Sequence, residues 1–225
     1  MFARTVWAVF RKDVTIEVRS RETLTTTLFF ALSAVLVFAF ALVREGRAVT
    51  GAAAGILWIA IAFAGTLALG RTFERERYTD TLRALMMAPA PRAAVYLGKL
   101  LGIVALLLLA ETILVPLVAL LFDAALLQRP ELIAALLVAG TIGFAAVGTL
   151  FAAMLVRARS RDVLLPVLLY PITIPVIIAG VQGTSAVAQT VPDEPMAVFW
   201  LMLLVSFDVV FVTLALWTFD PLMTD

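Results

Sequence analysis

Long apolar runs, separated by short charged segments, make up most of the chain. A spanning helix needs about 20 mainly apolar residues at 1.5 Å rise to cross roughly 30 Å of hydrocarbon. Six runs meet this requirement, at residues 24–43, 52–69, 100–122, 132–156, 163–181 and 197–219. A charged segment precedes the first run, so we expect it to be retained rather than cleaved as a signal peptide. The pattern predicts an all-α membrane protein, a six-transmembrane-helix bundle forming a single transmembrane domain over residues 1–225.

Composition supports the membrane prediction and limits the chemistry. Apolar residues make up 63% of the chain and charged residues only 15%, against about 25% charged in soluble domains. The chain has no Cys and no His, which excludes disulfides, structural zinc and histidine-based catalytic relays. We therefore expect a non-catalytic protein with no catalytic or metal-binding residues and no directly bound cofactor.

Basic residues between the runs predict the orientation, because Lys and Arg accumulate on the cytoplasmic side. Fourteen of the 17 basic residues fall on one side, in the N-terminal segment, in residues 70–99 and in residues 157–161. The other side has Arg44, Arg47 and Arg129. The bias predicts a multi-pass membrane protein with both termini in the cytoplasm.

Residues 3–20 have the pattern of a helix lying on the membrane surface. At 100° per residue, Val6, Trp7, Phe10, Val14 and Val18 cluster on one side, and basic residues share another. Glu17 falls within the apolar group, whereas Val9 and Ile16 fall outside it. We favour an interfacial helix, with a plain basic cap on the first span as the alternative.

The segment of residues 70–99 is the longest between spans. Its Glu74, Arg75, Glu76 and Arg77 alternate in sign, which suits a solvated extension of the second span. A short second helix is predicted around residues 79–87, where Leu82, Leu85 and Met86 share a face, and Pro89 ends it. Such a cytoplasmic helix suits contact with a soluble motor; an ordinary charged loop is the alternative.

Gly98-Lys99 is not part of a phosphate-binding loop. The motif G-x-x-x-x-G-K-[ST] requires glycine where Ala93 stands and a hydroxyl where Leu100 stands. If the chain works in an ATP-driven machine, the ATPase is a separate polypeptide.

Two carboxyl groups lie near the middle of predicted spans, Glu111 in the third and Asp208 in the sixth. An ionisable group at mid-bilayer costs about 2.5–3.5 kcal/mol on insertion scales, so it normally faces protein or water. We hypothesise that both face a cavity or subunit interface as part of a pathway, and that desolvation keeps at least one protonated at neutral pH. The alternative is a neutral carboxyl hydrogen-bonded to a neighbouring helix.

Prolines and glycines mark the remaining features of the spans. Pro166, Pro171 and Pro175 should kink the fifth span, which suits either a transport site or a static packing device. Small residues mark helix contacts: Gly51 and Gly55 open the second span, and Gly140, Gly143 and Gly148 follow one another along the fourth.

Ordered short motifs carry a family resemblance over nearly the full length. The chain resembles type-2 ABC transporter permeases and, more narrowly, the haem exporter protein B (CcmB) family of cytochrome c maturation. The residues that carry the resemblance are Lys12-Asp13, Phe73, Arg75-Glu76-Arg77, Leu82, Leu85, Ala88-Pro89, Tyr96-Leu97-Gly98-Lys99, a Gly/Ala-rich stretch at residues 143–153, Arg157 to Arg161, and Leu164-Leu165-Pro166. It departs from the family pattern at Asp80 and Arg83, within the segment expected to touch the ATPase.

The resemblance implies a permease subunit coupled to an ATPase subunit (CcmA-like), with CcmC-like and CcmD-like membrane subunits and, where two membrane halves are needed, a second copy of itself. It implies contact with the ATPase through Phe73 to Met86, and haem as a transported or handled species, with ATP used to release a haem-loaded chaperone (CcmE-like). It also implies a location in a bacterial inner membrane, so the lipid bilayer is the other expected partner, and no nucleic acid is expected. Two alternatives stay open: an ABC-2 exporter half for a lipid, drug or polysaccharide, and an ion-coupled secondary transporter using Glu111 and Asp208.

Overall fold

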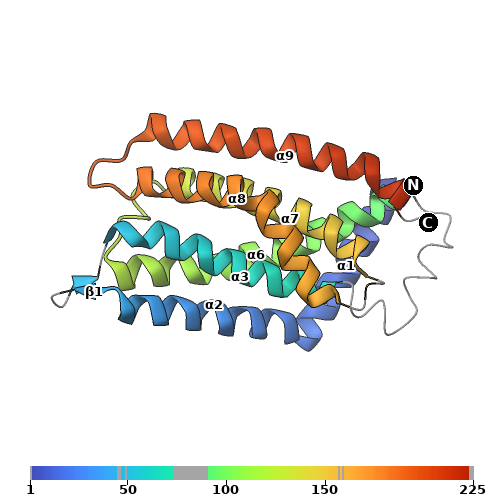
Figure 1. Ribbon diagram of the computed structural model, residues 1–225, viewed down its shortest axis with the longest axis horizontal. Helices are drawn as coiled ribbons and strands as arrows, with labels where there is room; N and C mark the ends of the chain where they lie inside the picture. Colours follow the sequence, from blue (N-terminus) through green and yellow to red (C-terminus); the bar gives the residue numbers. More distant parts are fainter. Residues whose placement is uncertain are drawn as a thin grey trace.

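Long helices dominate the computed structural model, which describes residues 2–44, 47–48, 50–72, 91–156, 158 and 160–222 (Figure 1). The helices are α1 (Phe2–Ser20), α2 (Glu22–Ala41), α3 (Ala53–Thr72), α6 (Arg92–Phe122), α7 (Pro130–Met154), α8 (Arg161–Val187) and α9 (Glu194–Leu222). The short elements are a two-residue antiparallel pair, β1 (Val43–Arg44) with β2 (Arg47–Ala48), and a 3-10 turn, η1 (Thr50–Ala52). Six helices, α2, α3 and α6 to α9, are long and apolar enough to cross a membrane. The predicted all-α, six-span fold is confirmed.

Span boundaries differ from the prediction mainly in the third and fifth spans. Helix α6 begins at Arg92 rather than at residue 100, and α8 continues to Val187 rather than ending at residue 181. The prediction stopped α6 at a charged residue, Lys99. Lys99 is compatible with a helix in the bundle because its ammonium group is paired with the carboxylate of Asp13.

Helix α7 forms the centre of the bundle, where it packs against α3, α6, α8 and α9. Glycines allow this close approach. A Cβ atom at Gly140 of α7 would lie 2.1 Å from the Trp58 ring of α3, and one at Gly180 of α8 would lie 2.3 Å from the same ring. The Trp58 indole Nε1 donates a 2.9 Å hydrogen bond to Thr184 Oγ1 of α8. A small-residue surface thus holds one large aromatic side chain among three helices.

The predicted packing role is confirmed for Gly140 and also for Gly148, where an added Cβ would meet Leu69 at 2.1 Å. It is wrong for Gly51 and Gly55, because a Cβ at either position has nothing within 4 Å. These two glycines lie where α3 begins, outside the packed centre of the bundle.

The two termini of the described chain lie at the same end of the bundle. Helix α1 and the end of α9 lie at the same end of the bundle, together with the end of α3 and the start of α6 (Figure 1). An even number of spans requires this arrangement. That this end faces the cytoplasm stays a prediction from the distribution of basic residues.

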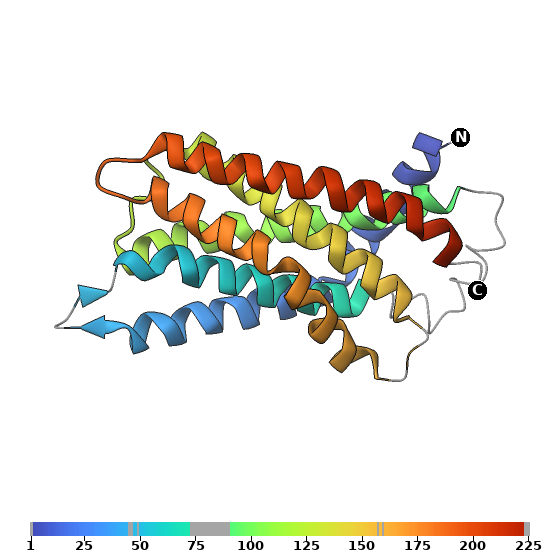
Figure 2. The same ribbon diagram turned by 45° about the horizontal axis from the view of Figure 1, so that its top comes forward.

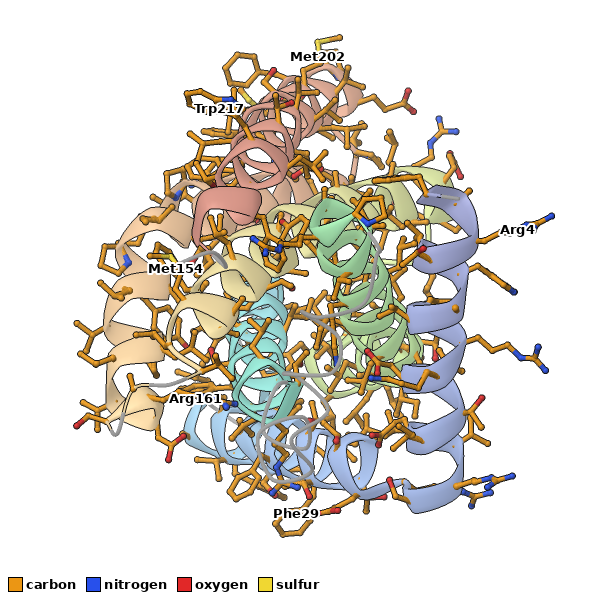
Figure 3. All side chains as sticks on the ribbon, turned by 90° about the vertical axis from the view of Figure 1, so that its right-hand side faces the viewer. Arg4, Phe29, Met154, Arg161, Met202 and Trp217 are labelled. Carbon is orange, nitrogen blue, oxygen red and sulfur yellow. The ribbon has the colours of Figure 1, made fainter. Side chains whose placement is uncertain are left out.

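Helix α1 lies across this end of the bundle. Figure 3 looks nearly along the axes of the spans and shows α1 lengthwise, so α1 runs roughly across their direction. Its buried residue is Val9, and Trp7 and Val18 are 62% and 65% exposed. The expected apolar face was therefore wrong in one respect: Val9, placed outside it, makes the contact with the bundle. Arg4 points away from the bundle (Figure 3). Whether the exposed apolar face lies in lipid stays a prediction.

Candidate functional site

The segment expected to contact an ATPase is framed by α3, which ends at Thr72, and by α6, which begins at Arg92. The predicted contact residues themselves lie outside the described residues; they are Phe73, Arg75, Glu76, Arg77, Leu82, Leu85 and Met86. The same holds for the short helix predicted around residues 79–87. What the structure describes is how the two ends of this segment are attached to the bundle.

The attachment is made by Tyr96, Gly98 and Lys99 in the first turns of α6, a group that we call the α6 junction. Tyr96 is fully buried. Its hydroxyl donates a 2.9 Å hydrogen bond to the backbone carbonyl of Ala146 in α7, and its ring lies 5.3 Å, centroid to centroid, from the ring of Phe219 in α9. Tyr96 thus connects the start of α6 to the central helix and to the last span.

Gly98 provides the contact with α1. A Cβ atom at this position would lie 2.6 Å from the Val9 Cβ and 3.0 Å from the Val6 carbonyl oxygen. Real Cβ atoms do not approach other atoms this closely, so glycine is required for the observed distance between the two helices. Helix α1 is therefore packed directly on α6, the helix that follows residues 73–90.

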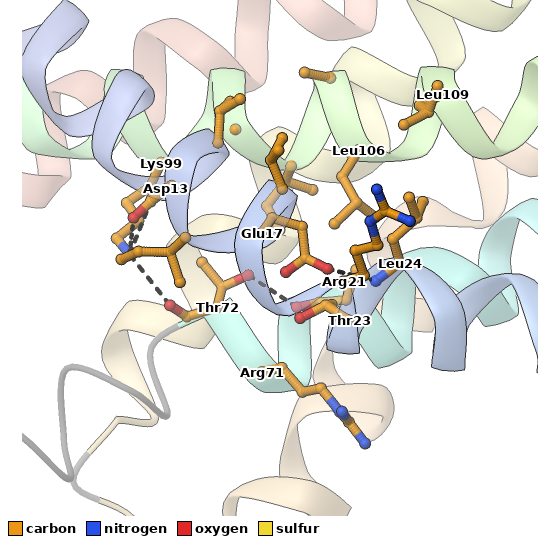
Figure 4. Close-up of a pocket in the computed structure, with 17 residues that line it drawn as sticks. Asp13, Glu17, Arg21, Thr23, Leu24, Arg71, Thr72, Lys99, Leu106 and Leu109 are labelled. Atoms are coloured by element: carbon orange, nitrogen blue, oxygen red, sulfur yellow. Dashed lines mark hydrogen bonds and ion pairs between the residues drawn. The ribbon is translucent and has the colours of Figure 1, made fainter.

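Lys99 links three elements through its ammonium group. The Nζ atom lies 3.1 Å from Oδ2 and 3.3 Å from Oδ1 of Asp13 in α1, and it donates a 3.2 Å hydrogen bond to the Thr72 carbonyl at the end of α3 (Figure 4). Its side chain is 2% exposed and that of Asp13 is 21% exposed. A buried ammonium must be paired, so this cluster fixes the positions of α1, α3 and α6 relative to one another.

A second polar contact holds α1 against α2. The Glu17 carboxylate accepts a 2.7 Å hydrogen bond from the Leu24 backbone N–H in the first turn of α2. This N–H has no partner within its own helix, so Glu17 acts as a cap supplied by the preceding helix. The contact explains why an acidic residue interrupts the apolar pattern of residues 3–20.

The two intramembrane carboxyls lie on opposite sides of α7. Glu111 of α6 is buried and accepts a hydrogen bond from Thr141 Oγ1 of α7, while its Oε2 has no hydrogen-bond partner among the described residues. Asp208 of α9 directs Oδ1 at Gly143, where an added Cβ would lie 2.6 Å away. Thr141 and Gly143 are two positions apart, which places them about 3 Å apart along the axis and about 200° around it. The carboxyls are therefore at similar depth but are not brought together.

The three prolines of the fifth span lie inside one continuous helix, α8. Figures 1 and 2 show this helix, golden to orange, changing direction within its first turns. Thr173 donates hydrogen bonds to the carbonyls of Leu169 and Tyr170, at 2.9 and 3.4 Å, between Pro166 and Pro175. Such back-bonding often accompanies bent helices.

Polar side chains among the described residues link neighbouring helices near one end of the bundle. No group of three or more His, Cys, Asp or Glu side chains that could hold a metal ion occurs in the described part of the chain. Through its contacts the α6 junction links α1, α3, α6, α7 and α9, close in sequence to the segment through which a motor is expected to act. Sequence reasoning singled out Lys12-Asp13 and Gly98-Lys99 as separate motifs, but missed that Asp13 pairs with Lys99.

Six helices that are long and apolar enough to span a membrane, with a further helix crossing one end, define a polytopic membrane protein. The family model described as "CcmB protein" matches residues 4–221. The chain therefore belongs to the CcmB family.

Curated relatives carry the name heme exporter protein B. The chain is 29% identical to that of Rhodobacter capsulatus over 191 residues, which covers 82% of this chain and 86% of the relative. It is 26% identical to that of Haemophilus influenzae over 184 residues, covering 82% and 83%. The match to the Escherichia coli K12 protein is 29% identical over 96 residues, and there the chain spans 44% of the relative's length.

Proposed function

We propose that the chain is the membrane permease subunit of an ABC-type complex in haem handling, and that a separate ATPase subunit drives it. Membership of the CcmB family and relatives named heme exporter protein B support this proposal. The chain lacks the glycine and hydroxyl of a phosphate-binding loop at Ala93 and Leu100. Haem is then a transported or handled species, and not a resident cofactor.

The observation that carries the proposal is the attachment of both ends of residues 73–90. Thr72, directly before this segment, is hydrogen-bonded through its carbonyl to Lys99, and Lys99 is paired with Asp13. Three residues before Lys99, Tyr96 contacts α7 and α9. A displacement of the segment is therefore passed on to α1, α3, α6, α7 and α9 together, because packed interfaces move as units rather than deform continuously.

The contact with the ATPase is tested by Leu82→Asp and Leu85→Asp in the assembled complex. We expect both variants to insert and assemble with less than about a tenth of the wild-type stimulation of ATP hydrolysis, because a charge in an apolar contact costs on the order of 2–4 kcal/mol. Ala158→Asp, in the α7–α8 connection at the same end of the bundle, is the matched control and should retain stimulation. Full stimulation by both Leu variants would contradict the proposal.

The finer assignment is cytochrome c maturation, in which ATP hydrolysis drives haem transport or release of a haem-loaded chaperone. It predicts partners resembling CcmA, CcmC and CcmD, with a second copy of this chain if the complex has two membrane halves. Co-purification followed by mass measurement of the intact complex tests the partners and the copy number. A stable, active particle containing this chain and no ATPase would overturn the assignment.

A second candidate function, an ion-coupled secondary transporter, is favoured by the buried carboxyls Glu111 and Asp208. Their unpaired buried oxygens, Glu111 Oε2 and Asp208 Oδ1, are the kind of group that binds protons in carriers. Proton-gradient-driven uptake into liposomes containing this chain alone, lost in Glu111→Gln and Asp208→Asn, would support it. Wild-type ATP-driven activity of both variants in the complex would instead leave these carboxyls with a packing role.

A further inference from the structure

A cavity of about 460 Å³ lies beside the α6 junction, between α1, the start of α2, the end of α3 and α6 (Figure 4). Neither of the two intramembrane carboxyls, Glu111 and Asp208, is among the residues that line it. Its lining includes polar groups of α1 and α3 and apolar side chains of α6. The volume falls within the range of about 300–1,000 Å³ typical of small-molecule sites.

The lining is ordered by polarity along the direction of the spans. Lys99 and Thr72 lie at the end of the bundle, whereas Ile103, Leu106 and Leu109 follow on α6 toward its middle. Ten residues of helix separate Lys99 from Leu109, or about 15 Å at 1.5 Å per residue. Leu109 is 51% exposed, so this apolar end reaches the outer, lipid-facing surface of the bundle. A polar end at the membrane surface and an apolar end within the membrane match an amphiphile with one head and long chains.

The charges of the lining favour an anionic head. Five ionisable groups line the cavity, Asp13, Glu17, Arg21, Arg71 and Lys99, with a formal sum of +1. Both carboxylates are already engaged, Asp13 by the Lys99 ammonium and Glu17 by the Leu24 backbone N–H.

Arg21 is the cation available to a ligand. Its guanidinium makes no ion pair or hydrogen bond with the residues that the structure describes, whereas Arg71 lies 3.3 Å from the Glu22 carboxylate. The backbone of Arg21 occupies the left-handed region at φ 51°, in the break between α1 and α2. In Figure 4 its side chain extends toward Leu106 and Leu109 of α6. A guanidinium is well suited to bidentate recognition of phosphate.

We propose that this cavity binds an anionic phospholipid, with its phosphate at Arg21 and an acyl chain along Leu106 and Leu109. In the orientation predicted from the basic residues, the lipid comes from the cytoplasmic leaflet. Among the described residues that line it there is no His, Cys, Met or Tyr, the side chains that usually bind haem iron. The cavity therefore fits a lipid better than a tetrapyrrole. A lipid bound in the cavity contacts α1, α2, α3 and α6 beside the α6 junction. The geometry of the α6 junction then depends on the lipid composition of the membrane.

Native mass spectrometry of the full-length purified chain tests the proposal, with phosphatidylglycerol and phosphatidylcholine of identical acyl chains as probes. We expect the wild-type chain to retain phosphatidylglycerol preferentially, and Arg21→Gln to weaken that retention about tenfold, the effect of losing one charge-assisted contact. Arg21→Lys should keep most of the preference. Arg4→Gln removes the same charge from an exposed position of α1 outside this cavity and should bind as wild type. Leu106→Trp should weaken binding of both lipids by filling the apolar end.

Three results would overturn the proposal. The first is equal retention of the two lipids by the wild-type chain. The second is unchanged phosphatidylglycerol binding by Arg21→Gln. The third is displacement of the lipid by hemin in the wild-type chain but not in Arg21→Gln. The last result would make the cavity a tetrapyrrole site. Because the measurement needs neither ATP nor partner subunits, its outcome is independent of the proposed function.

Discussion

The ion pair of Asp13 with Lys99 should show an asymmetric response to mutation. Asp13→Asn removes a carboxylate from an ammonium that is 2% exposed. Breaking a buried pair in this way costs about 3–5 kcal/mol, and the partial exposure of Asp13 reduces our expectation to about 2–3 kcal/mol. Lys99→Met leaves a carboxylate that is 21% exposed and still lies 3.1 Å from Lys12, so we expect a loss of about 1 kcal/mol.

The double variant distinguishes this reasoning from a general loss of packing. When Asp13→Asn and Lys99→Met are combined, no buried charge is left uncompensated, because Lys12, which also loses Asp13, is 34% exposed. The loss should therefore be about 1 kcal/mol instead of the sum of the two single losses. The measurement is unfolding in mixed micelles with increasing dodecyl sulfate, followed by the fluorescence of the four tryptophans. Lys12→Met, which removes the more exposed partner of Asp13, is the control and should change stability by less than about 1 kcal/mol. Equal losses for the two single variants, combined with an additive double variant, would refute the buried-pair argument.

Two further predictions concern the neighbours of this pair. Gly98→Ala should destabilise the chain by about 1–3 kcal/mol, because its Cβ would lie 2.6 Å from Val9 Cβ. Gly55→Ala is the control: this position has open space around it, so the variant should be neutral or stabilising. Equal unfolding midpoints for the two variants would contradict the close packing of α1 on α6. Tyr96→Phe should cost about 1 kcal/mol through loss of the hydrogen bond to the Ala146 carbonyl; an unchanged unfolding free energy would show that this bond contributes nothing net.

The spans could be predicted from sequence because the requirement for a spanning helix is local. A helix in lipid satisfies its backbone hydrogen bonds internally and needs only a sufficient apolar run, so six runs predicted six helices. The same local criterion began the predicted third span at residue 100, whereas helix α6 begins at Arg92. It treated Lys99 as a loop residue, whereas the compensating Asp13 lies 86 positions away.

The α6 junction could be predicted only in part. The resemblance pointed to Tyr96, Gly98 and Lys99 as one motif, but not to their partners on α1, α3, α7 and α9, because no local pattern specifies which helix a side chain will meet. The hydrophobic periodicity of residues 3–20 likewise failed to single out Val9. This helix is contacted by protein on one side and exposed on another, so it has two apolar faces rather than one.

The most direct test of the account is the number of ATP molecules hydrolysed per haem delivered by the reconstituted complex. Wild type, Asp13→Asn and Lys12→Met would be compared at equal assembly, established by co-purification of all subunits. The account predicts that Asp13→Asn raises this ratio severalfold, because the ATPase still hydrolyses ATP while the movement it causes is no longer passed to all the helices of the bundle together. It predicts that Lys12→Met leaves the ratio unchanged. An unchanged ratio in Asp13→Asn, or haem delivery by this chain without an ATPase, would contradict the account.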